Sequence, residues 1–281
     1  MTAPTTKWVA AGFQHGQIMV LGADGYPVAA STKTDLYEGL AIERGRELTV
    51  TPPDPRTIAH KGDDVVFAIQ HLPPDTAVTM AYKTGIDDMA LEAALNGTIV
   101  TTVGEINILP QLTDRQGREN QVCIIGQQMG QPAGKGAADA GVAGWRQIIV
   151  PMAKMIAKPT GMAEANNPYE KNFTVVPTMV TKMPWGRALA EGTDGCLSAF
   201  QLQANSFYPL WWANFKGDGA TLVFTFNTAY QAVSTTKMAV FVNGVLTTAN
   251  LTKATDKITF TSTAPADDAN IAVIYEVASI P

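Results

Sequence analysis

The last third of the chain alternates apolar and polar residues with a period of two, and this pattern constrains the fold most. Between Lys216 and Val277 three runs follow it: Leu222, Phe224 and Phe226; Met238, Val240 and Val242; and Ile271, Val273 and Tyr275. The period puts one set of side chains on a buried sheet face and the other set towards water. Asn243 and Gly244 lie where a type I′ turn needs two residues that tolerate positive φ. The sequence therefore predicts a small β-domain at this end.

The composition indicates real hydrophobic cores beneath a weakly charged surface. A chain of 281 residues suits one large or two ordinary domains, and 46% of the residues are hydrophobic. Only 16% are charged, against roughly 25% in soluble globular domains. Such a surface either stays soluble through Thr, Asn and Gln or is partly covered by other subunits. The second alternative is the one expected of an assembly protein.

Charge and hydropathy exclude several classes of function. The formal net charge is −5 and no long basic run occurs, which argues against a nucleic-acid-binding patch. An acidic surface still lets DNA pass close by without being bound. The N-terminal residues MTAPTTKWVAAGFQHG do not form a signal peptide, and no run approaches the roughly 20 apolar residues of a membrane span. We therefore expect folding in a cytoplasm, with Cys123 and Cys196 as free, buried thiols.

Residues 1–205 predict a larger β-domain with one short helix. Strands are expected at 8–13, 17–21, 46–51, 64–71, 77–82, 98–103, 105–109, 121–127, 145–157, 172–181 and 196–202. Thr84 and Asp87 can form a capping box. Apolar residues at helical spacing follow, and Asn96 and Gly97 end the helix. We expect this helix to pack flat against a sheet.

Two segments lack a strand or helix pattern. Residues 126–144, GQQMGQPAGKGAADAGVAG, are rich in Gly and Ala and nearly uncharged. Glycine increases the entropy lost on ordering, and loops this long are usually functional or disordered. Residues 206–218 are predicted to be a linker between the first domain and a module at 219–281. Its aromatic side chains are expected to dock against a surface, and the candidates are Phe207, Tyr208, Trp211 and Trp212.

The order of elements from about Trp8 to Gln203 resembles that of phage tail tube proteins. The segments WRQIIVPMAKMIAKP and NFTVVPTMVTKMPWG carry most of this resemblance. The later segments VNGVL and ITFTSTAPADDANIAVIYEV resemble the immunoglobulin-like modules on phage tails and fibres. The resemblance implies a mainly β fold, in which a tail-tube β-sandwich or barrel has one short flanking helix. A small C-terminal immunoglobulin-like β-sandwich follows it.

The same resemblance implies a structural role in the virion tail. Six subunits per ring would stack into a tube that conducts genomic DNA without binding it specifically. Assembly would take place in the host cytoplasm with other phage tail proteins, and the module would lie outside. The strand edges at 145–157 and 172–181 are candidates for pairing between subunits. The long loop would order between rings, with candidate residues Gly126, Gly130, Gly134, Lys135 and Gly144. The channel would repel phosphate through candidate acidic residues Asp63, Asp64, Asp87, Asp88 and Glu92.

The sequence predicts no catalytic, cofactor or metal site. The segment GQPAGKG is one residue short of a phosphate-binding loop and lacks its Ser or Thr. His15, His60 and His71 lack the close spacing of metal ligands, and no G-x-S-x-G motif occurs. Adjacent carboxylates such as Asp267 and Asp268 would point to opposite faces of a strand. Turn positions explain such pairs better than a catalytic or calcium site.

Two alternative functions remain open. The first is a head decoration or baseplate protein, and the second is a receptor- or glycan-binding tail fibre protein. In the fibre protein the C-terminal module would bind the ligand. Residues 126–144 distinguish these possibilities, because a tube subunit should bury them between rings whereas an adhesin would leave them open to proteases.

Overall fold

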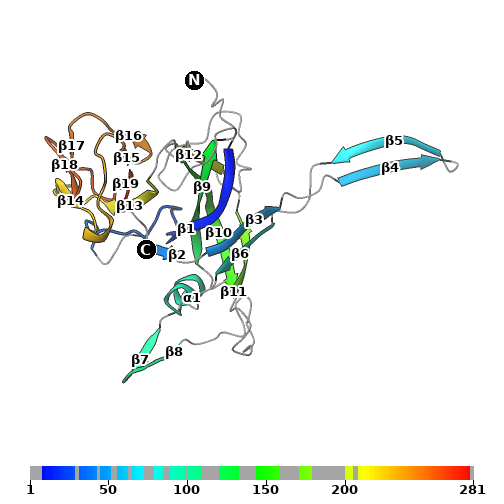
Figure 1. Ribbon diagram of the computed structural model, residues 1–281, viewed down its shortest axis with the longest axis horizontal. Coiled ribbons are helices and arrows are strands. Elements are labelled where there is room, and N and C mark those ends of the chain that lie inside the picture. The colour runs from blue at the N-terminus through cyan, green and yellow to red at the C-terminus, as the bar shows by residue number, and fades with distance from the viewer. Residues whose placement is uncertain are drawn as a thin grey trace.

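The chain is mainly β, with strands in several antiparallel sheets (Figure 1). The computed structural model describes residues 8–28, 32–42, 45–51, 56–62, 65–72, 79–84, 89–98, 100–108, 120–132, 144–157, 171–178, 200–204 and 208–278. The prediction of a mainly β fold is confirmed.

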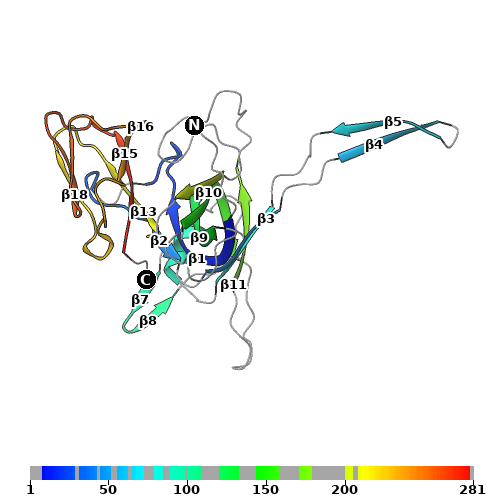
Figure 2. The ribbon, with the colours of Figure 1, turned by 45° about the horizontal axis from the view of Figure 1, so that its top comes forward.

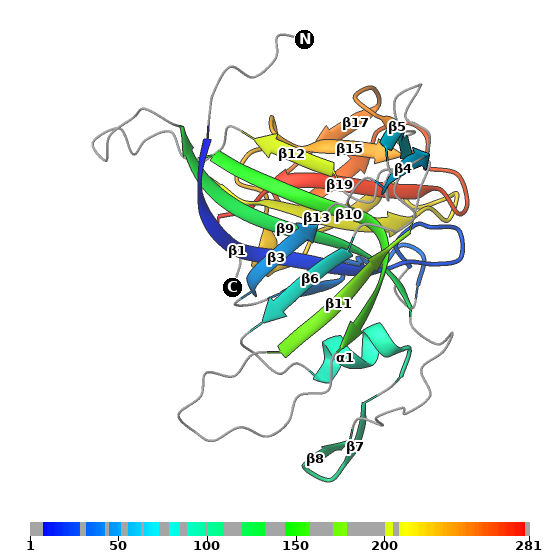
Figure 3. The same cartoon turned by 90° about the vertical axis from the view of Figure 1, so that its right-hand side faces the viewer.

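The main sheet has eight strands, and its order is β2-β1-β9-β10-β11-β6-β3 with β12 paired to β10. The sheet curls, so that β3 comes close to β1 at the opposite end of the order (Figure 3). Its strands are β1 (Trp8–Val20), β2 (Leu40–Ile42), β3 (Gly45–Thr51), β6 (Thr79–Thr84), β9 (Gln121–Pro132), β10 (Gly144–Ala157), β11 (Lys171–Pro177) and β12 (Phe200–Ala204).

Helix α1 (Met89–Asn96) lies against the inner face of this curl. Leu91 and Leu95 join a buried cluster with apolar residues of β1, β9, β10 and β11. Gly97 has a φ of 64°, the left-handed conformation that ends many helices, as the sequence predicted. The predicted capping box stays a prediction, because residues 85–88, between the end of β6 at Thr84 and the start of α1 at Met89, lie outside the described residues. Asp87 lies outside the described residues.

The C-terminal module is a sandwich of two antiparallel sheets. One sheet has the order β13-β19-β15-β16, and its strands are β13 (Leu210–Lys216), β15 (Ala239–Val242), β16 (Val245–Leu246) and β19 (Asn270–Glu276). The other has the order β14-β18-β17, with strands β14 (Val223–Thr225), β17 (Leu251–Lys253) and β18 (Lys257–Phe260). A short 3-10 helix, Thr228–Tyr230, follows β14. The predicted turn between β15 and β16 is confirmed, since Asn243 and Gly244 have φ values of 49° and 81°.

The predicted linker at 206–218 is wrong over most of its length. Residues 210–216 form β13, which pairs along its whole length with β19, from Leu210↔Glu276 to Lys216↔Asn270. The segment LWWANFK shows no alternation because six of its seven residues are buried, on both faces of the strand. The module therefore begins with this strand.

The module and the main sheet form three layers. Trp211, Val273 and Tyr275 point into the sandwich core. Their neighbours Trp212 and Ile274 point the other way, into a second buried cluster shared with the outer face of the main sheet. That outer face contributes Met19, Leu21, Cys123, Ile125 and Ile149. The expectation that the second set of side chains faces water is thus wrong for β19, whose seven residues are all buried.

Two short hairpins extend from the main body (Figures 1 and 2). One consists of β4 (Arg56–Gly62) and β5 (Val65–Leu72), the other of β7 (Thr101–Val103) and β8 (Ile106–Ile108). In the part of the chain that the structure describes, each hairpin pairs only with itself. Most of the predicted strands are found in the sheets or in the hairpins, whereas β2, β4, β13 and β17 were not predicted.

The strands proposed for pairing between subunits lie inside the main sheet. β10 has β9 on one side and β11 and β12 on the other, and β11 lies between β10 and β6. Their edges are therefore occupied within the chain, and the prediction that 145–157 and 172–181 offer free edges is wrong. Long apolar strands are usually central in a sheet, because both of their faces can be buried there. β2, β3 and β12 lie at the sheet's margins.

Candidate functional site

The Gly-rich segment predicted as an inter-ring loop is shorter than expected. Gly126 and Gly130 lie within β9 and pair with residues of β10, and Gly144 is the first residue of β10. Gly134 and Lys135 lie outside the described residues. The predicted loop is thus wrong at both ends. β9 pairs with β1 and with β10, and this pairing overrides the low strand propensity of glycine.

Of the five acidic residues proposed to line a channel, the structure describes only Glu92. Asp63, Asp64, Asp87 and Asp88 lie outside the described residues. Glu92 is in the first turn of α1 and is only 4% exposed, because this side of the helix faces the sheet. The proposal that Glu92 supplies surface charge to a channel is therefore wrong.

The aromatic candidates lie at the junction between the module and the main sheet. Phe207 is outside the described residues, and Tyr208 is partly exposed. Trp211 and Trp212 are each 1% exposed and point to opposite faces of β13. Trp211 stacks on Tyr230 with ring centroids 4.2 Å apart. Trp212 is the one that packs against the main sheet.

Three buried glutamines of the main sheet contact β13. Gln17 lies on β1, Gln127 on β9 and Gln147 on β10, and all three are 0% exposed. The Gln17 amide donates to the Trp212 carbonyl at 3.0 Å and accepts from the Trp212 N–H at 3.1 Å. The Gln127 amide makes the same pair of bonds with Leu210, at 2.5 and 3.2 Å. Gln147 makes two longer contacts of 3.4 Å, to the Leu210 carbonyl and from the Trp212 indole N–H.

Sequence reasoning did not identify these glutamines as functional. A signal was present for two of them, because apolar strand residues follow directly in Gln17-Ile18-Met19 and Gln147-Ile148-Ile149, whereas Gln127 stands between Gly126 and Gln128. A polar residue on a buried strand face needs hydrogen-bond partners. The partners, however, come from a segment far away in the sequence, so the pattern alone did not reveal them.

Residues 32–41, which we call the strap, connect the two parts a second time. Tyr37 exchanges backbone hydrogen bonds with Asn214 of β13 at 2.8 and 2.9 Å. The Lys216 N–H donates to the Lys33 carbonyl at 2.8 Å, and the Tyr37 hydroxyl accepts from the Val20 N–H at 2.8 Å. The strap then continues into β2 at the edge of the main sheet. It therefore links β1 to β13 through its own backbone.

The carboxylate of Glu38 inserts from the strap into the module. It accepts hydrogen bonds from the Trp211 indole N–H at 2.8 Å and from the Asn227 amide at 3.2 Å. Burial raises the pKa of Glu38 above its ordinary value of 4.5, and these two hydrogen bonds oppose part of the rise. Burial also raises the pKa of Tyr275, and the charge of Glu38 adds to that rise.

We expect the stability contributed by Glu38 to increase as the pH falls from 7 towards 4.5. Because its folded-state pKa is raised, this contribution is fully present below 4.5 and is lost as the pH rises through the folded-state pKa. Urea unfolding of the wild type and of Glu38→Gln across this range isolates the effect, since other titrating groups are shared. The wild type should gain stability relative to the variant at lower pH. A difference that stays constant or reverses would contradict the assignment.

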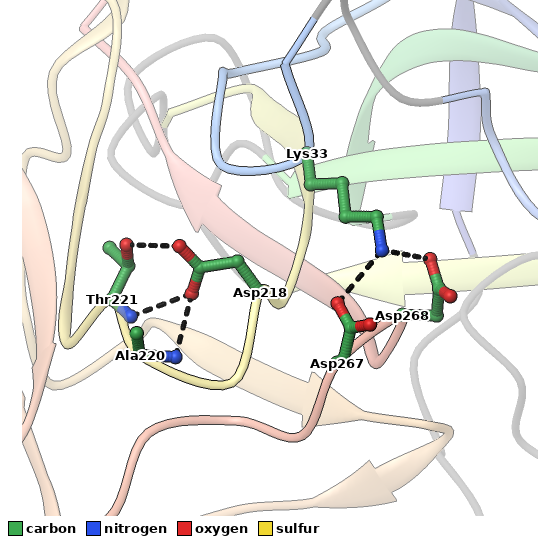
Figure 4. A network of polar contacts seen from close by, with 6 residues as sticks. All are labelled: Lys33, Asp218, Ala220, Thr221, Asp267 and Asp268. Carbon is green, nitrogen blue, oxygen red and sulfur yellow. Dashed lines mark hydrogen bonds and ion pairs between the residues drawn. The ribbon is translucent and has the colours of Figure 1, made fainter.

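An ion-pair cluster also ties the strap to the module (Figure 4). The Lys33 ammonium lies 2.8 Å from a carboxylate oxygen of Asp267 and 3.0 Å from one of Asp268. These hydrogen bonds, that to Asp267 first, raise the pKa of Lys33. The sequence interpretation of Asp267 and Asp268 as turn residues is confirmed, since Asp268 has a φ of 60°. Because the pair is not in an extended strand, the two carboxylates do not diverge but both reach Lys33.

Asp218 stabilises the loop that leads from β13 to β14 (Figure 4). Its carboxylate accepts from the N–H groups of Thr221 and Ala220 at 2.6 and 2.9 Å, and from the Thr221 hydroxyl at 2.7 Å. These bonds, the one from the Thr221 N–H first, lower the pKa of Asp218 to about 2. Across the described ranges, no group of three or more His, Cys, Asp or Glu side chains is arranged to hold a metal ion.

Among the side chains that the structure describes, the exposed large apolar ones lie on β7, on β11 and on the module. Val103 in β7 is 61% exposed, and all three residues of β7 are exposed. In the module, Val245 and Leu246 of the edge strand β16 are 69% and 56% exposed. Isolated apolar residues are normal on a protein surface, so the hairpins are distinguished by their lack of a strand partner outside themselves, in the residues described.

No family model matches the sequence, and no curated protein matches it. Within the ranges the structure describes, no helix combines the length and apolar character needed to cross a bilayer.

Proposed function

We propose that the chain is a phage tail tube subunit. Its main domain assembles into stacked rings, six subunits to a ring, around a channel that conducts genomic DNA. The C-terminal module, which we take to be immunoglobulin-like, lies on the outer side. The mainly β fold and the resemblance carried by residues 144–159 and 170–186 support this role.

The observation that carries the proposal is the β4–β5 hairpin. It extends away from the main sheet (Figures 1 and 2), and β4 and β5 pair from Arg56↔Leu72 to Gly62↔Val65. An isolated two-stranded hairpin is at most marginally stable in water. Each outer edge also presents backbone groups that can pair with another strand. A neighbouring subunit that pairs with the hairpin would stabilise it and would also provide hydrogen-bond partners for the backbone groups of its outer edges.

Both faces of the main sheet are partly covered within the chain, so its marginal strands and the two hairpins are the parts available for contact with other subunits. α1 covers part of the inner face of the main sheet, and the module covers part of the outer face. Subunits that join side by side would therefore use the margins β2, β3 and β12 rather than β10 or β11. These three marginal strands take the place of 145–157 and 172–181, which the sequence had suggested for pairing between subunits. Pairing at sheet margins is a common way for subunits to close a ring.

Electron microscopy tests the proposal directly. Negative-stain images of the purified full chain should show hollow polymers of uniform diameter. A variant in which residues 56–72 are replaced by a short Gly-Ser connection should remain unassembled, with an unchanged far-ultraviolet spectrum for the rest of the chain. Val245→Ser, at an exposed site in the module, is the matched control and should still polymerise.

Two outcomes would contradict the proposal. One is a monodisperse monomer at high concentration together with the absence of any tube in mature particles. The other is polymerisation by the hairpin variant as efficient as that of the control. Binding of the unassembled chain to host cells or glycans would instead favour the fibre protein, and attachment to capsids would favour a decoration protein.

A further inference from the structure

β13 has two edges, and one of them pairs with β19. On the other edge, most backbone N–H and carbonyl groups are hydrogen-bonded to residues from the first part of the chain. Along this strand, the residues Leu210, Trp212 and Asn214 each have their N–H and carbonyl bonded to Gln127, Gln17 and Tyr37 respectively. The N–H of Lys216 is bonded to the Lys33 carbonyl. The partners alternate along β13 as they would along a neighbouring strand. β19 occupies the opposite edge of β13.

A glutamine amide can replace a peptide group at such an edge. It carries one acceptor oxygen and an NH₂ donor, so a single side chain can satisfy both the N–H and the carbonyl of one residue. Gln17 and Gln127 each do this, and both are fully buried. The contacts are to backbone atoms, which every residue except proline offers in full. Recognition at these two positions therefore depends on the strand and its register, not on its side chains.

We propose that Gln17 and Gln127 form a clamp that makes the C-terminal module an obligatory part of one folding unit. The apolar residues around the clamp point to the same conclusion. Met19, Cys123, Ile125 and Ile149 on the outer face of the main sheet are 0% exposed, and Trp212 and Ile274 of the module are among their partners. Without the module, this face would present a contiguous apolar patch to water.

The strap strengthens the clamp from the other side. It bonds to β13 at Tyr37 and Lys33, and its Leu36 packs against the sandwich core of the module. The main sheet thus holds the module through β1, β9, β10 and the strap. The clamp is a property of the single chain, and it holds whether or not the chain polymerises.

Charge substitution in the full chain tests the clamp. In Gln17→Glu and Gln127→Glu, the carboxylate can still accept from the strand N–H but opposes the strand carbonyl with a second oxygen. Because an uncompensated buried charge is costly, each variant should lower Tm by about 10 °C at pH 7. Gln147→Glu, whose contacts are longer at 3.4 Å, should have a smaller effect. Gln231→Glu, at an exposed site in the module, is the matched control and should leave Tm unchanged.

The pH dependence separates the clamp from a general packing defect. A protonated carboxyl has one donor and one acceptor, so it can again satisfy the N–H and the carbonyl of one strand residue. It lacks the second donor of the amide, which in Gln17 is bonded to the Glu38 carbonyl. The deficit of Gln17→Glu and Gln127→Glu relative to the wild type should therefore shrink as the pH falls from 7 to 5. Calorimetry of the wild type should show a single transition with equal calorimetric and van't Hoff enthalpies.

Three results would overturn the inference. The first is two resolved transitions in the wild type, with one unaffected by Gln127→Glu. The second is a Tm for Gln17→Glu and Gln127→Glu equal to that of Gln231→Glu. The third is a deficit that does not change with pH. If the two stronger variants do not fold, Gln147→Glu provides the same comparison with a smaller shift.

Discussion

Replacement of Trp212 by alanine is expected to lower the free energy of unfolding by about 4 kcal/mol, as for other large buried aromatic side chains. Trp212 is 1% exposed and lies between the module and the main sheet, in a cluster with Met19, Ile125 and Ile149. Truncation would leave a cavity at the centre of the contact between two layers. Urea unfolding followed by far-ultraviolet circular dichroism measures the change.

Two further variants define the cause of this loss. Trp212→Phe keeps most of the apolar volume but removes the indole N–H that donates to Gln147, so it should cost about 1 kcal/mol. Leu246→Ala, at a residue that is 56% exposed, should have almost no effect. A stability of Trp212→Ala close to that of Leu246→Ala would show that the module does not pack against the sheet in this way.

Gly39→Ala should destabilise the chain by about 3 kcal/mol. Gly39 has a φ of 70°, and a Cβ atom there would meet the backbone carbonyl of Ile18 and approach Cγ of Met19 to 2.8 Å. The strap lies against β1 at this point, so it would have to move away from the main sheet. Its bonds to β13 through Tyr37 would weaken at the same time.

Gly104→Ala is the matched control for this prediction. Gly104 has a similar φ of 64°, but a Cβ atom there would meet nothing within 4 Å. It should therefore show only the conformational cost of a left-handed backbone, about 1 kcal/mol. The difference between the two variants measures the steric part. Equal losses in thermal or urea unfolding would mean that the strap does not lie closely against β1.

Much of the fold was predictable because its signals are local. Alternation predicted most strands, and Asn243-Gly244 predicted a hairpin that the structure confirms. The strand β13 was not predicted, because both of its faces are buried and its sequence LWWANFK does not alternate. Alternation identifies the side chains that share a face, but it does not reveal whether a third layer covers the other face.

The junction was less predictable, because it is built from contacts distant in sequence. Composition indicated a loop from 126 to 144, yet pairing with β1 and β10 extends β9 to Pro132. Of the two tryptophans predicted to dock, Trp212 packs against the main sheet and Trp211 points into the core of the module. The amides of Gln17 and Gln127 that bind β13 were not predicted. Strand propensity depends strongly on tertiary context. A glutamine in an apolar strand indicates a buried polar contact without identifying its partner.

Gln17 and the strand β13 that it binds are far apart along the chain, and this separation has a consequence for biosynthesis. Gln17 bonds to a residue 195 positions later, and β13 itself pairs with β19, which ends at Glu276. A nascent chain on the ribosome can pair β1 with β2 and β9 early, but the strand that Gln17 binds is complete with its own partner only after β19 has been synthesised. Products of premature termination would emerge with the apolar side of the first sheet uncovered, where chaperones and proteases recognise them. The pairing of β13 with β19 thus acts as a check that only polypeptides containing both strands mature.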